Sequence, residues 1–317
     1  MNAIEIDGIT KAYGRLRALD DISLKVDEGE IYGLIGPDGA GKTTLFRIMT
    51  TLMLPDSGSG RVCGLDIVKD YAAIRKMIGY MPGRFSLYQD LSVKENLDYF
   101  ATLFGTTVRE NYGTIKEIYS QIEPFRDRRA GKLSGGMKQK LALCCALVHR
   151  PSVLFLDEPT TGVDAVSRTD FWNMLFRIKA SGVTIFVSTP YMDEAARCDR
   201  LALIRDGVII GTGTPDEIVS GFPYRLLSVK GSHMYPLLKE LRRTEGVISC
   251  FSFGDSHHVT YNPEGTDPEK ILASLSASGF GDCSAREIPP CIEDCFMWLS
   301  SSSDHNGQTI QTDIQNG

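Results

Sequence analysis

The sequence of 317 residues has few histidines and lacks both CxxC cysteine pairs and long apolar runs. Zinc and dithiol redox sites are disfavoured, because no two of the eight cysteines have the spacing that such sites use. No segment approaches the roughly 20 consecutive apolar residues that a membrane-spanning helix requires. The first residues include acids and lack the apolar core of a signal peptide. These absences predict a chain that folds in the cytosol, with cysteines such as Cys144 and Cys145 as buried free thiols.

The charge balance is weakly acidic, with 34 lysines and arginines, 40 acidic residues and a net charge of −6. A dedicated nucleic-acid-binding protein would need a basic face to neutralise phosphates, and the chain has no basic blocks. We therefore expect no nucleic-acid partner. The apolar share of 42% is typical of a folded protein, and the length suggests about two domains.

The pattern of apolar residues predicts an α/β fold over the first two thirds of the chain. Alternating segments within residues 1–35 indicate short strands, and residues 84–150 have a mostly helical pattern. From Pro151 onward, buried strands alternate with a helix in the order expected of a parallel sheet. We expect one domain over residues 1–222, with a helical subdomain at about 84–150.

A second, smaller domain is predicted over residues 223–299. Segments of strand and helix character follow one another there in the order strand, helix, strand, strand, helix, strand. That order is typical of a ferredoxin-like α+β domain. The stretch 300–317 is polar with little apolar content, so we expect it to be a disordered tail.

The sharpest chemical signal is a glycine-rich segment that fits the pattern G-x-x-x-x-G-K-[ST]. It lies between a predicted strand and a predicted helix, where backbone N–H groups and the helix N-terminus bind phosphate. A chance glycine-rich turn is the alternative, and average residue usage gives such a match in about one chain of this length in a hundred. Lys42 would reach the β- and γ-phosphates of a nucleotide, and the Thr43 hydroxyl would bind Mg²⁺. The segment comprises Gly36, Pro37, Asp38, Gly39, Ala40, Gly41, Lys42, Thr43 and Thr44.

A second signal is a pair of acids, Asp157 and Glu158, at the end of a short apolar strand. Ligands of parallel sheets bind at the carboxyl ends of the strands. Asp157 would hold Mg²⁺, mostly through water, and Glu158 would act as general base on the attacking water. An ordinary strand-end turn before Pro159 would explain the same residues, but a preceding phosphate loop makes that alternative weak.

A third segment, Leu133-Ser-Gly-Gly-Met137, opens a predicted helix. Ser134, Gly135 and Gly136 would form a second anion-binding helix N-terminus. Taken alone, simple capping of the helix by Ser134 explains the segment better. Its meaning therefore depends on the segments around it.

Taken in this order, these segments resemble the nucleotide-binding subunit of ATP-binding cassette (ABC) transporters over roughly residues 1–222. The resemblance implies a P-loop NTPase fold, with a RecA-like core, an antiparallel β subdomain and a helical subdomain. It implies ATP and Mg²⁺ as cofactors, Tyr13 as the aromatic that stacks on adenine, and Asp164 in the D-loop. It also implies a dimer in which the signature of one subunit, Ser134–Gly136, faces the phosphate loop of the other.

The resemblance is nearest to the ATPases of ABC-2 type exporters, which often carry a C-terminal domain with a motif like that of Pro290–Leu299. It implies separate transmembrane permease subunits and a second nucleotide-binding subunit, in a homodimer or a heterodimer. The expected location is peripheral, on the cytoplasmic face of the cell membrane. We interpret the C-terminal domain as regulatory or dimer-stabilising, with a passive extension as the alternative.

Two positions depart from the family pattern. Gly83 stands where the family has a Gln that contacts Mg²⁺ and water, and Gln89 is not expected to replace it. Pro190 stands where the family has a His that contacts the γ-phosphate, and proline has no side-chain donor. We interpret the site as one that binds ATP but hydrolyses it slowly, while its signature completes the site of a partner. A homodimer that tolerates both replacements is the alternative.

Two further functions stay open. A soluble ABC-type ATPase of DNA repair or translation would show zinc-type cysteine pairs, a long coiled coil, or two cassettes with a basic linker, and the sequence shows none of these. A non-catalytic regulatory subunit would use ATP only as a clamp, and measured ATP turnover would distinguish it from an enzyme.

Overall fold

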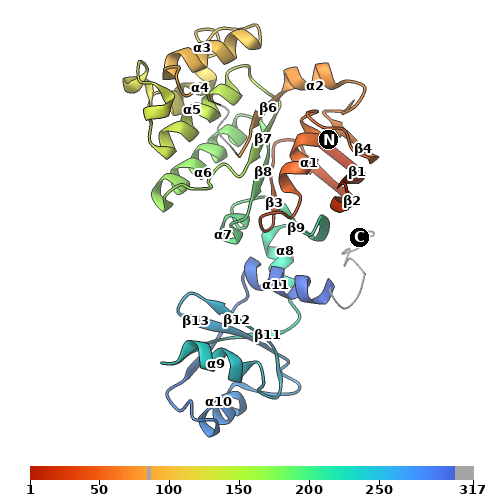
Figure 1. Cartoon of the computed structure of the whole chain (residues 1–317), viewed down its shortest axis with the longest axis vertical. Coiled ribbons are helices and arrows are strands. Elements are labelled where there is room, and N and C mark those ends of the chain that lie inside the picture. The colour runs from red at the N-terminus through yellow and green to blue at the C-terminus, as the bar shows by residue number, and fades with distance from the viewer. Residues whose placement is uncertain (84–86, 304–317) are drawn as a thin grey trace. The chain divides into compact units, whose positions relative to one another are not determined.

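The computed structural model describes residues 1–83 and 87–303 (Figure 1). The chain divides into two compact units, Met1–Pro215 and Asp216–Ser302. The division falls between Pro215, the first residue of helix α8 (Pro215–Ser220), and Asp216, whereas the sequence placed the domain boundary after residue 222. The reason is that Ile218 and Val219 of α8 pack against an apolar cluster of the second unit.

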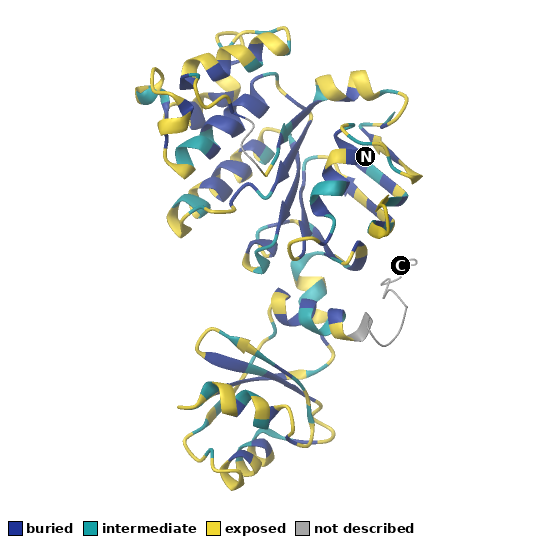
Figure 2. Ribbon diagram, in the orientation of Figure 1, coloured by how far each residue is buried: buried dark blue, intermediate teal, exposed yellow. Residues whose placement is uncertain are grey.

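The first unit is built on a six-stranded sheet in the order β10-β9-β3-β8-β7-β6. All neighbouring strands are parallel except β10, which pairs antiparallel with β9 at the edge. Strands β3, β7 and β8 are buried at every residue, as expected of a parallel sheet covered on both faces (Figure 2). The strands are β3 (Ile31–Ile35), β6 (Ile78–Met81), β7 (Val153–Asp157), β8 (Thr184–Thr189), β9 (Arg200–Arg205) and β10 (Val208–Gly213).

A second, antiparallel sheet of the same unit has the order β2-β1-β4-β5. Its longest pairing is the hairpin of β1 and β2. The hairpin is tied to the parallel sheet by a hydrogen bond from Asp20 N to Gly207 O at 2.8 Å. The strands are β1 (Asn2–Tyr13), β2 (Leu16–Asp27), β4 (Ser57–Val62) and β5 (Leu65–Asp66).

Helix α1 is anchored by aromatic packing against the parallel sheet. The Phe46 ring lies 4.7 Å from that of Phe186 on β8 and 5.8 Å from that of Phe155 on β7, measured between centroids. The start of α1 is thereby held at the carboxyl end of the sheet. Figure 1 shows α3, α4 and α5 grouped apart from β1, β2 and β4, within the stretch expected to be helical. The helices are α1 (Lys42–Met49), α2 (Tyr71–Met77), α3 (Val93–Leu103), α4 (Tyr112–Tyr119), α5 (Gly135–Leu147), α6 (Ala165–Ala180) and α7 (Met192–Ala195), with 3₁₀ turns at Glu123–Phe125 and Ala130–Lys132.

The second unit has the βαββαβ order expected of a ferredoxin-like domain. Its four strands pair antiparallel in the order β12-β13-β11-β14, over a core that includes Leu227, Leu237 and Ile271. The elements are β11 (Arg225–Lys230), α9 (Met234–Leu241), β12 (Val247–Phe253), β13 (Ser256–Tyr261), α10 (Pro268–Ala277), β14 (Ser284–Ile288) and α11 (Ile292–Ser303).

Helix α11 corrects one expectation about the C-terminus. It continues through Ser303, whereas the disordered tail was expected to begin at Ser300. The remainder of that expected tail, 304–317, lies outside the described residues. Within the described residues, no helix is both long enough and apolar enough to span a bilayer.

Candidate functional site

The glycine-rich segment forms a tight loop between β3 and α1, as its pattern predicts. Gly36 has no room for a side chain, because a Cβ there would lie 2.1 Å from the backbone oxygen of Ile204. Gly41 directly precedes α1 with φ of +103°, and a Cβ there would lie 2.4 Å from Ala18 O. Both glycines are therefore required by close packing. The loop ends on the N-terminus of α1, whose free N–H groups favour anions.

Lys42 lies beneath this loop with its ammonium group surrounded by oxygen atoms. Its Nζ donates hydrogen bonds to Gly36 O at 2.8 Å and to Pro37 O at 2.9 Å. The same nitrogen lies 3.1 Å from Oε1 of Glu158, and the Lys42 side chain is only 2% exposed. A buried ammonium group needs such partners. Two of the residues predicted to be catalytic, Lys42 and Glu158, are thus in direct contact.

The acid pair lies where β7 leaves the sheet. Asp157 is the last residue of β7 and pairs in register with Ser188 on β8, whose hydroxyl donates to Asp157 Oδ1 at 2.7 Å. The Glu158 N–H donates to Ser188 O at 3.0 Å, and the Glu158 side chain is 22% exposed. Glu158 has φ of +49°, a conformation that is uncommon outside glycine and that clusters at functional sites. The Thr161 hydroxyl donates to Glu158 Oε2 at 3.4 Å.

The environment of Asp157 also affects the neighbouring strand. Burial, together with the negative charge of Asp157, raises the pKa of Tyr80 on β6 to about 12. Ser188 was missed by sequence reasoning, because nothing in the chain before β8 indicates its register with β7. A polar residue near the end of a buried apolar strand is the only signal that points to it.

Thr43 and Asp157, the two residues predicted to bind Mg²⁺, both carry side-chain oxygens. Thr43 is in the first turn of α1, and Asp157 is almost fully buried. Among the described residues, no group of three or more histidine, cysteine or acidic side chains forms a metal centre of its own.

Tyr13 is placed at the free end of the β1–β2 hairpin. Its side chain is 45% exposed, and its hydroxyl donates to Met53 Sδ at 3.1 Å. The hairpin reaches the phosphate loop, since Ala18 O on β2 packs against Gly41. An exposed ring on an element that contacts the loop is available for stacking against a base.

The signature and the D-loop lie against each other within the chain. Ser134 caps α5 by accepting a hydrogen bond from Met137 N at 3.4 Å. A Cβ at Gly136 would lie 3.0 Å from Ser167 Oγ, so the signature helix approaches the start of α6 closely. Asp164 caps α6 by accepting from Ser167 N at 2.9 Å and from Val166 N at 3.1 Å. These hydrogen bonds hold the pKa of Asp164 below its usual range.

Of the two departures from the family pattern, Gly83 lies next to the acid pair. A Cβ at Gly83 would lie 3.0 Å from Asp157 O, so the missing side chain would project at the acids. Gln89 lies elsewhere, where its carbonyl oxygen accepts from Gly131 N at 2.9 Å. Pro190 directly follows β8. In the described part of the first unit the one histidine is His149, whose ring stacks on Phe104 with centroids 3.7 Å apart.

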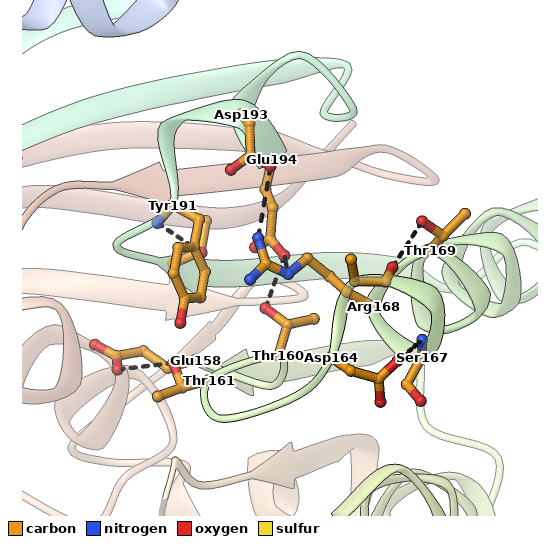
Figure 3. Close-up of polar contacts among 12 residues, drawn as sticks. Glu158, Thr160, Thr161, Asp164, Ser167, Arg168, Thr169, Tyr191, Asp193 and Glu194 are labelled. Atoms are coloured by element: carbon orange, nitrogen blue, oxygen red, sulfur yellow. Dashed lines mark hydrogen bonds and ion pairs between the residues drawn. The ribbon is translucent and has the colours of Figure 1, made fainter. Parts of the chain in front are cut away.

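A polar cluster that sequence reasoning missed joins the D-loop side of the site to α7 (Figure 3). Glu194 on α7 is fully buried, and its Oε1 accepts a hydrogen bond from the Thr160 hydroxyl at 2.8 Å. The Arg168 guanidinium lies 3.7 Å from Glu194 and 3.5 Å from Asp193, and its central carbon is 4.1 Å from the centroid of the Tyr191 ring. Thr160 and Arg168 thus contact residues that follow them by more than 20 positions in the chain. The spacing of residues in the sequence does not reveal these contacts.

Comparisons with known proteins agree with this arrangement. Residues 19–161 match the family model described as ABC transporter. The chain is 37% identical over 306 residues to the probable multidrug ABC transporter ATP-binding protein YbhF of Escherichia coli (strain K12), covering 93% of this chain and 52% of YbhF. It is 33% identical over 313 residues to the Nod factor export ATP-binding protein I of Rhizobium sp. (strain N33), covering 94% of this chain and 97% of that protein.

A solved structure gives the same result for the fold. The cbiO1 protein from Clostridium perfringens, part of the ABC transporter complex cbiONQ, matches with a TM-score of 0.63 at 26% identity. The match covers 69% of this chain and 91% of that chain. The chain spans about half the length of YbhF, at 52%.

Proposed function

Because the chain belongs to the family of ABC transporter ATP-binding proteins, we propose that it is the ATP-binding subunit of an exporter. In this proposal it couples ATP binding and hydrolysis to export by separate membrane subunits. The observation that carries the proposal is the buried Lys42 ammonium beneath the phosphate loop, 3.1 Å from Glu158. The relatives are named for multidrug transport and for Nod factor export, which supports an exporter.

The nucleotide is bound in this proposal by the loop of Gly36–Thr44. Backbone N–H groups and the N-terminus of α1 hold the phosphates, Lys42 neutralises their charge, and Tyr13 stacks on the adenine. Thr43 and Asp157 hold Mg²⁺, with Ser188 orienting the Asp157 carboxylate through the 2.7 Å hydrogen bond. When bound, Mg²⁺ neutralises negative charge on the β- and γ-phosphates.

For hydrolysis, the Glu158 carboxylate must leave the Lys42 ammonium group and contact the attacking water instead. Its carboxylate faces Lys42 at 3.1 Å, and a terminal phosphate would compete for that ammonium. Glu158 is then free to accept a proton from the attacking water, as a general base does. Its backbone is held for this role by the hydrogen bond from Glu158 N to Ser188 O.

The two replaced residues make the site of this chain slow. Losing one preorganised donor to a transition state lowers the rate by about 10²–10³, or roughly 2.7–4 kcal/mol. Binding is less affected, because Lys42 and the loop amides are unchanged. In this proposal, Gly83 and Pro190 therefore lower the rate of ATP hydrolysis and have a smaller effect on ATP binding.

The proposed assembly is a dimer of nucleotide-binding subunits on the cytoplasmic face of the membrane. The signature Ser134–Gly136 acts in trans on the partner's nucleotide, and the adjoining Asp164 loop contacts the partner. The partner is either a second copy of this chain or a related subunit. In the second case, the related subunit carries its own Gln and His. The dimer acts with separate transmembrane permease subunits. The ferredoxin-like second unit has a dimer-stabilising or regulatory role.

Nucleotide binding and assembly are tested together. The full chain is isolated with its neighbours from native membranes, and ATP binding is compared with that of Lys42→Ala. Binding that depends on Lys42, in a complex with membrane subunits, is the expected result. A soluble partner in translation or repair would contradict the exporter, and ATP binding without any turnover in the complex would favour a regulatory clamp.

The slow site is tested by single-turnover hydrolysis with the purified chain in excess over ATP. We expect a rate about 10²–10³ below that of cassettes with both Gln and His. A rate equal to theirs would show that a homodimer tolerates both replacements.

A further inference from the structure

Tyr191 carries a hydroxyl group one residue after Pro190, the position where the usual histidine is missing. It directly follows Pro190 after β8, and its side chain is partly buried. Figure 3 shows its phenol ring directed toward Glu158 and Thr161. A phenol donates a hydrogen bond, which the Pro190 side chain cannot do. The loop that lacks histidine therefore still presents a donor on the side of the general-base candidate.

The ring of Tyr191 is held in this orientation from two directions. The Arg168 guanidinium carbon lies 4.1 Å from the ring centroid, a cation–π contact. The Tyr191 N–H donates to Thr189 Oγ1 at 3.1 Å, which fixes the backbone where the side chain leaves it. Arg168 is itself held by Glu194, 3.7 Å from its Nε. A donor on a fixed ring loses little conformational freedom when it contacts substrate.

We propose that the Tyr191 hydroxyl donates a hydrogen bond to the terminal phosphate during hydrolysis and supplies part of what the missing histidine would, so that the site stays slow mainly because Gly83 has no side chain. This inference rests on the proposed ATPase function. In the step, the water oxygen forms a bond to the γ-phosphorus and the bond from that phosphorus to the bridging oxygen breaks. The bridging oxygen leaves with the electron pair as part of ADP, and the proton of the water passes to Glu158. Tyr191 keeps its proton and acts only as a donor.

If Tyr191 only provides a ring for Arg168 to pack on, the expected hydrolysis rate of Tyr191→Phe differs from the rate expected under the proposal. Tyr191→Phe keeps the ring and its contact with Arg168 but removes the hydroxyl. If the hydroxyl acts on the phosphate, Tyr191→Phe lowers the single-turnover rate by about 10- to 100-fold, the effect of one hydrogen bond to a charged group. Its thermal midpoint stays at the wild-type value. If only the ring matters, Tyr191→Phe has the wild-type rate and the proposal is overturned.

The Tyr191→Phe substitution is also made in a chain that carries Pro190→His, to test whether the hydroxyl replaces histidine. Pro190→His restores an imidazole donor, so Tyr191→Phe is expected to change the rate less than about threefold when added to it. An undiminished effect in the Pro190→His background would overturn the replacement. Tyr235→Phe is the matched control, because Tyr235 is a 68% exposed tyrosine of the second unit. It is expected to leave the rate unchanged.

The outcomes separate this inference from the proposed function. ATP binding that depends on Lys42 is measured on the same full-length preparations by equilibrium dialysis. If ATP binds but the wild-type rate equals that of Lys42→Ala, the Tyr191 inference fails while the ATP-binding role stands. If ATP does not bind, the proposed function itself fails.

Discussion

Removing Arg168 is expected to destabilise the first unit through the buried carboxylate of Glu194. Glu194 is fully buried, and among the described residues its Oε2 has no hydrogen-bond partner. Thr160 and Arg168 are the groups that face its Oε1. Arg168→Met keeps much of the length of the side chain but removes the positive charge, leaving Thr160 alone with a buried anion.

The magnitude follows from burial and distance. Removing one partner of a fully buried ion pair costs about 3–5 kcal/mol. The Arg168 side chain is 23% exposed and its Nε is 3.7 Å from Glu194 Oε1, so solvent screens the pair. We therefore expect a loss of about 2 kcal/mol. With a urea slope of about 2–3 kcal/mol per molar, the unfolding midpoint falls by roughly 0.8 M.

Tryptophan fluorescence provides an assay specific to this unit. The chain has two tryptophans, and Trp172 is fully buried on α6, the helix that carries Arg168. Trp298→Phe, in the second unit, serves as the reference background and leaves Trp172 as the single reporter. Urea unfolding of this reference is compared with that of the same chain carrying Arg168→Met.

The double variant Arg168→Met with Glu194→Gln decides the mechanism. A neutral amide at position 194 still accepts from Thr160, so the buried unpaired charge is gone and more than half of the lost stability should return. A double variant whose loss equals the sum of the single losses would refute the reasoning. So would an Arg168→Met midpoint within 0.2 M of the reference, since roughly 0.8 M is expected.

Three further outcomes are expected. Ser188→Ala removes the donor to the buried Asp157 and should weaken Mg²⁺-dependent ATP binding and lower stability by about 1–3 kcal/mol, measured by titration and by urea unfolding. Gly36→Ala should abolish ATP binding because its Cβ would overlap a backbone oxygen, whereas Gly113→Ala, in open space on α4, should bind ATP normally. The hydrogen bonds to Asp164 lower its pKa in the folded state, so their stabilisation is complete above the unfolded value of about 3.9 and is lost as pH falls through the lower folded value. The difference in urea midpoint between wild type and Asp164→Asn should therefore shrink between pH 5 and pH 2, and a constant difference would contradict this.

Contiguous motifs made the central part of the site predictable. The glycine-rich loop and the acid pair are each local in sequence, and each follows a strand whose apolar residues are recognisable. Because parallel strands end at the same edge of a sheet, Lys42 and Glu158 could be expected near each other. The ferredoxin-like order of the second unit was predictable for a similar reason, since each element has its own periodicity.

Contacts that depend on strand register could not be predicted. Ser188 reaches Asp157 only because β8 pairs with β7 in one particular register. Glu194 is an acid on a short helix, and acids at such positions are usually exposed, so its burial depends on packing around Thr160 and Arg168. The end of α11 was also missed, because serine-rich sequence favours caps and coil over helix.

The contact between Lys42 and Glu158 makes the phosphate loop a site of competition between two anions. A terminal phosphate entering the loop meets an ammonium group that already has a carboxylate 3.1 Å away. The affinity for a nucleoside triphosphate therefore depends on how much more strongly the Lys42 ammonium group attracts the terminal phosphate than the Glu158 carboxylate. A nucleoside diphosphate, which lacks the terminal group, leaves the carboxylate in place. In the proposed function, removing the negative charge of Glu158 would accordingly strengthen triphosphate binding more than diphosphate binding, so that one side chain would influence both the preference for ATP and its hydrolysis.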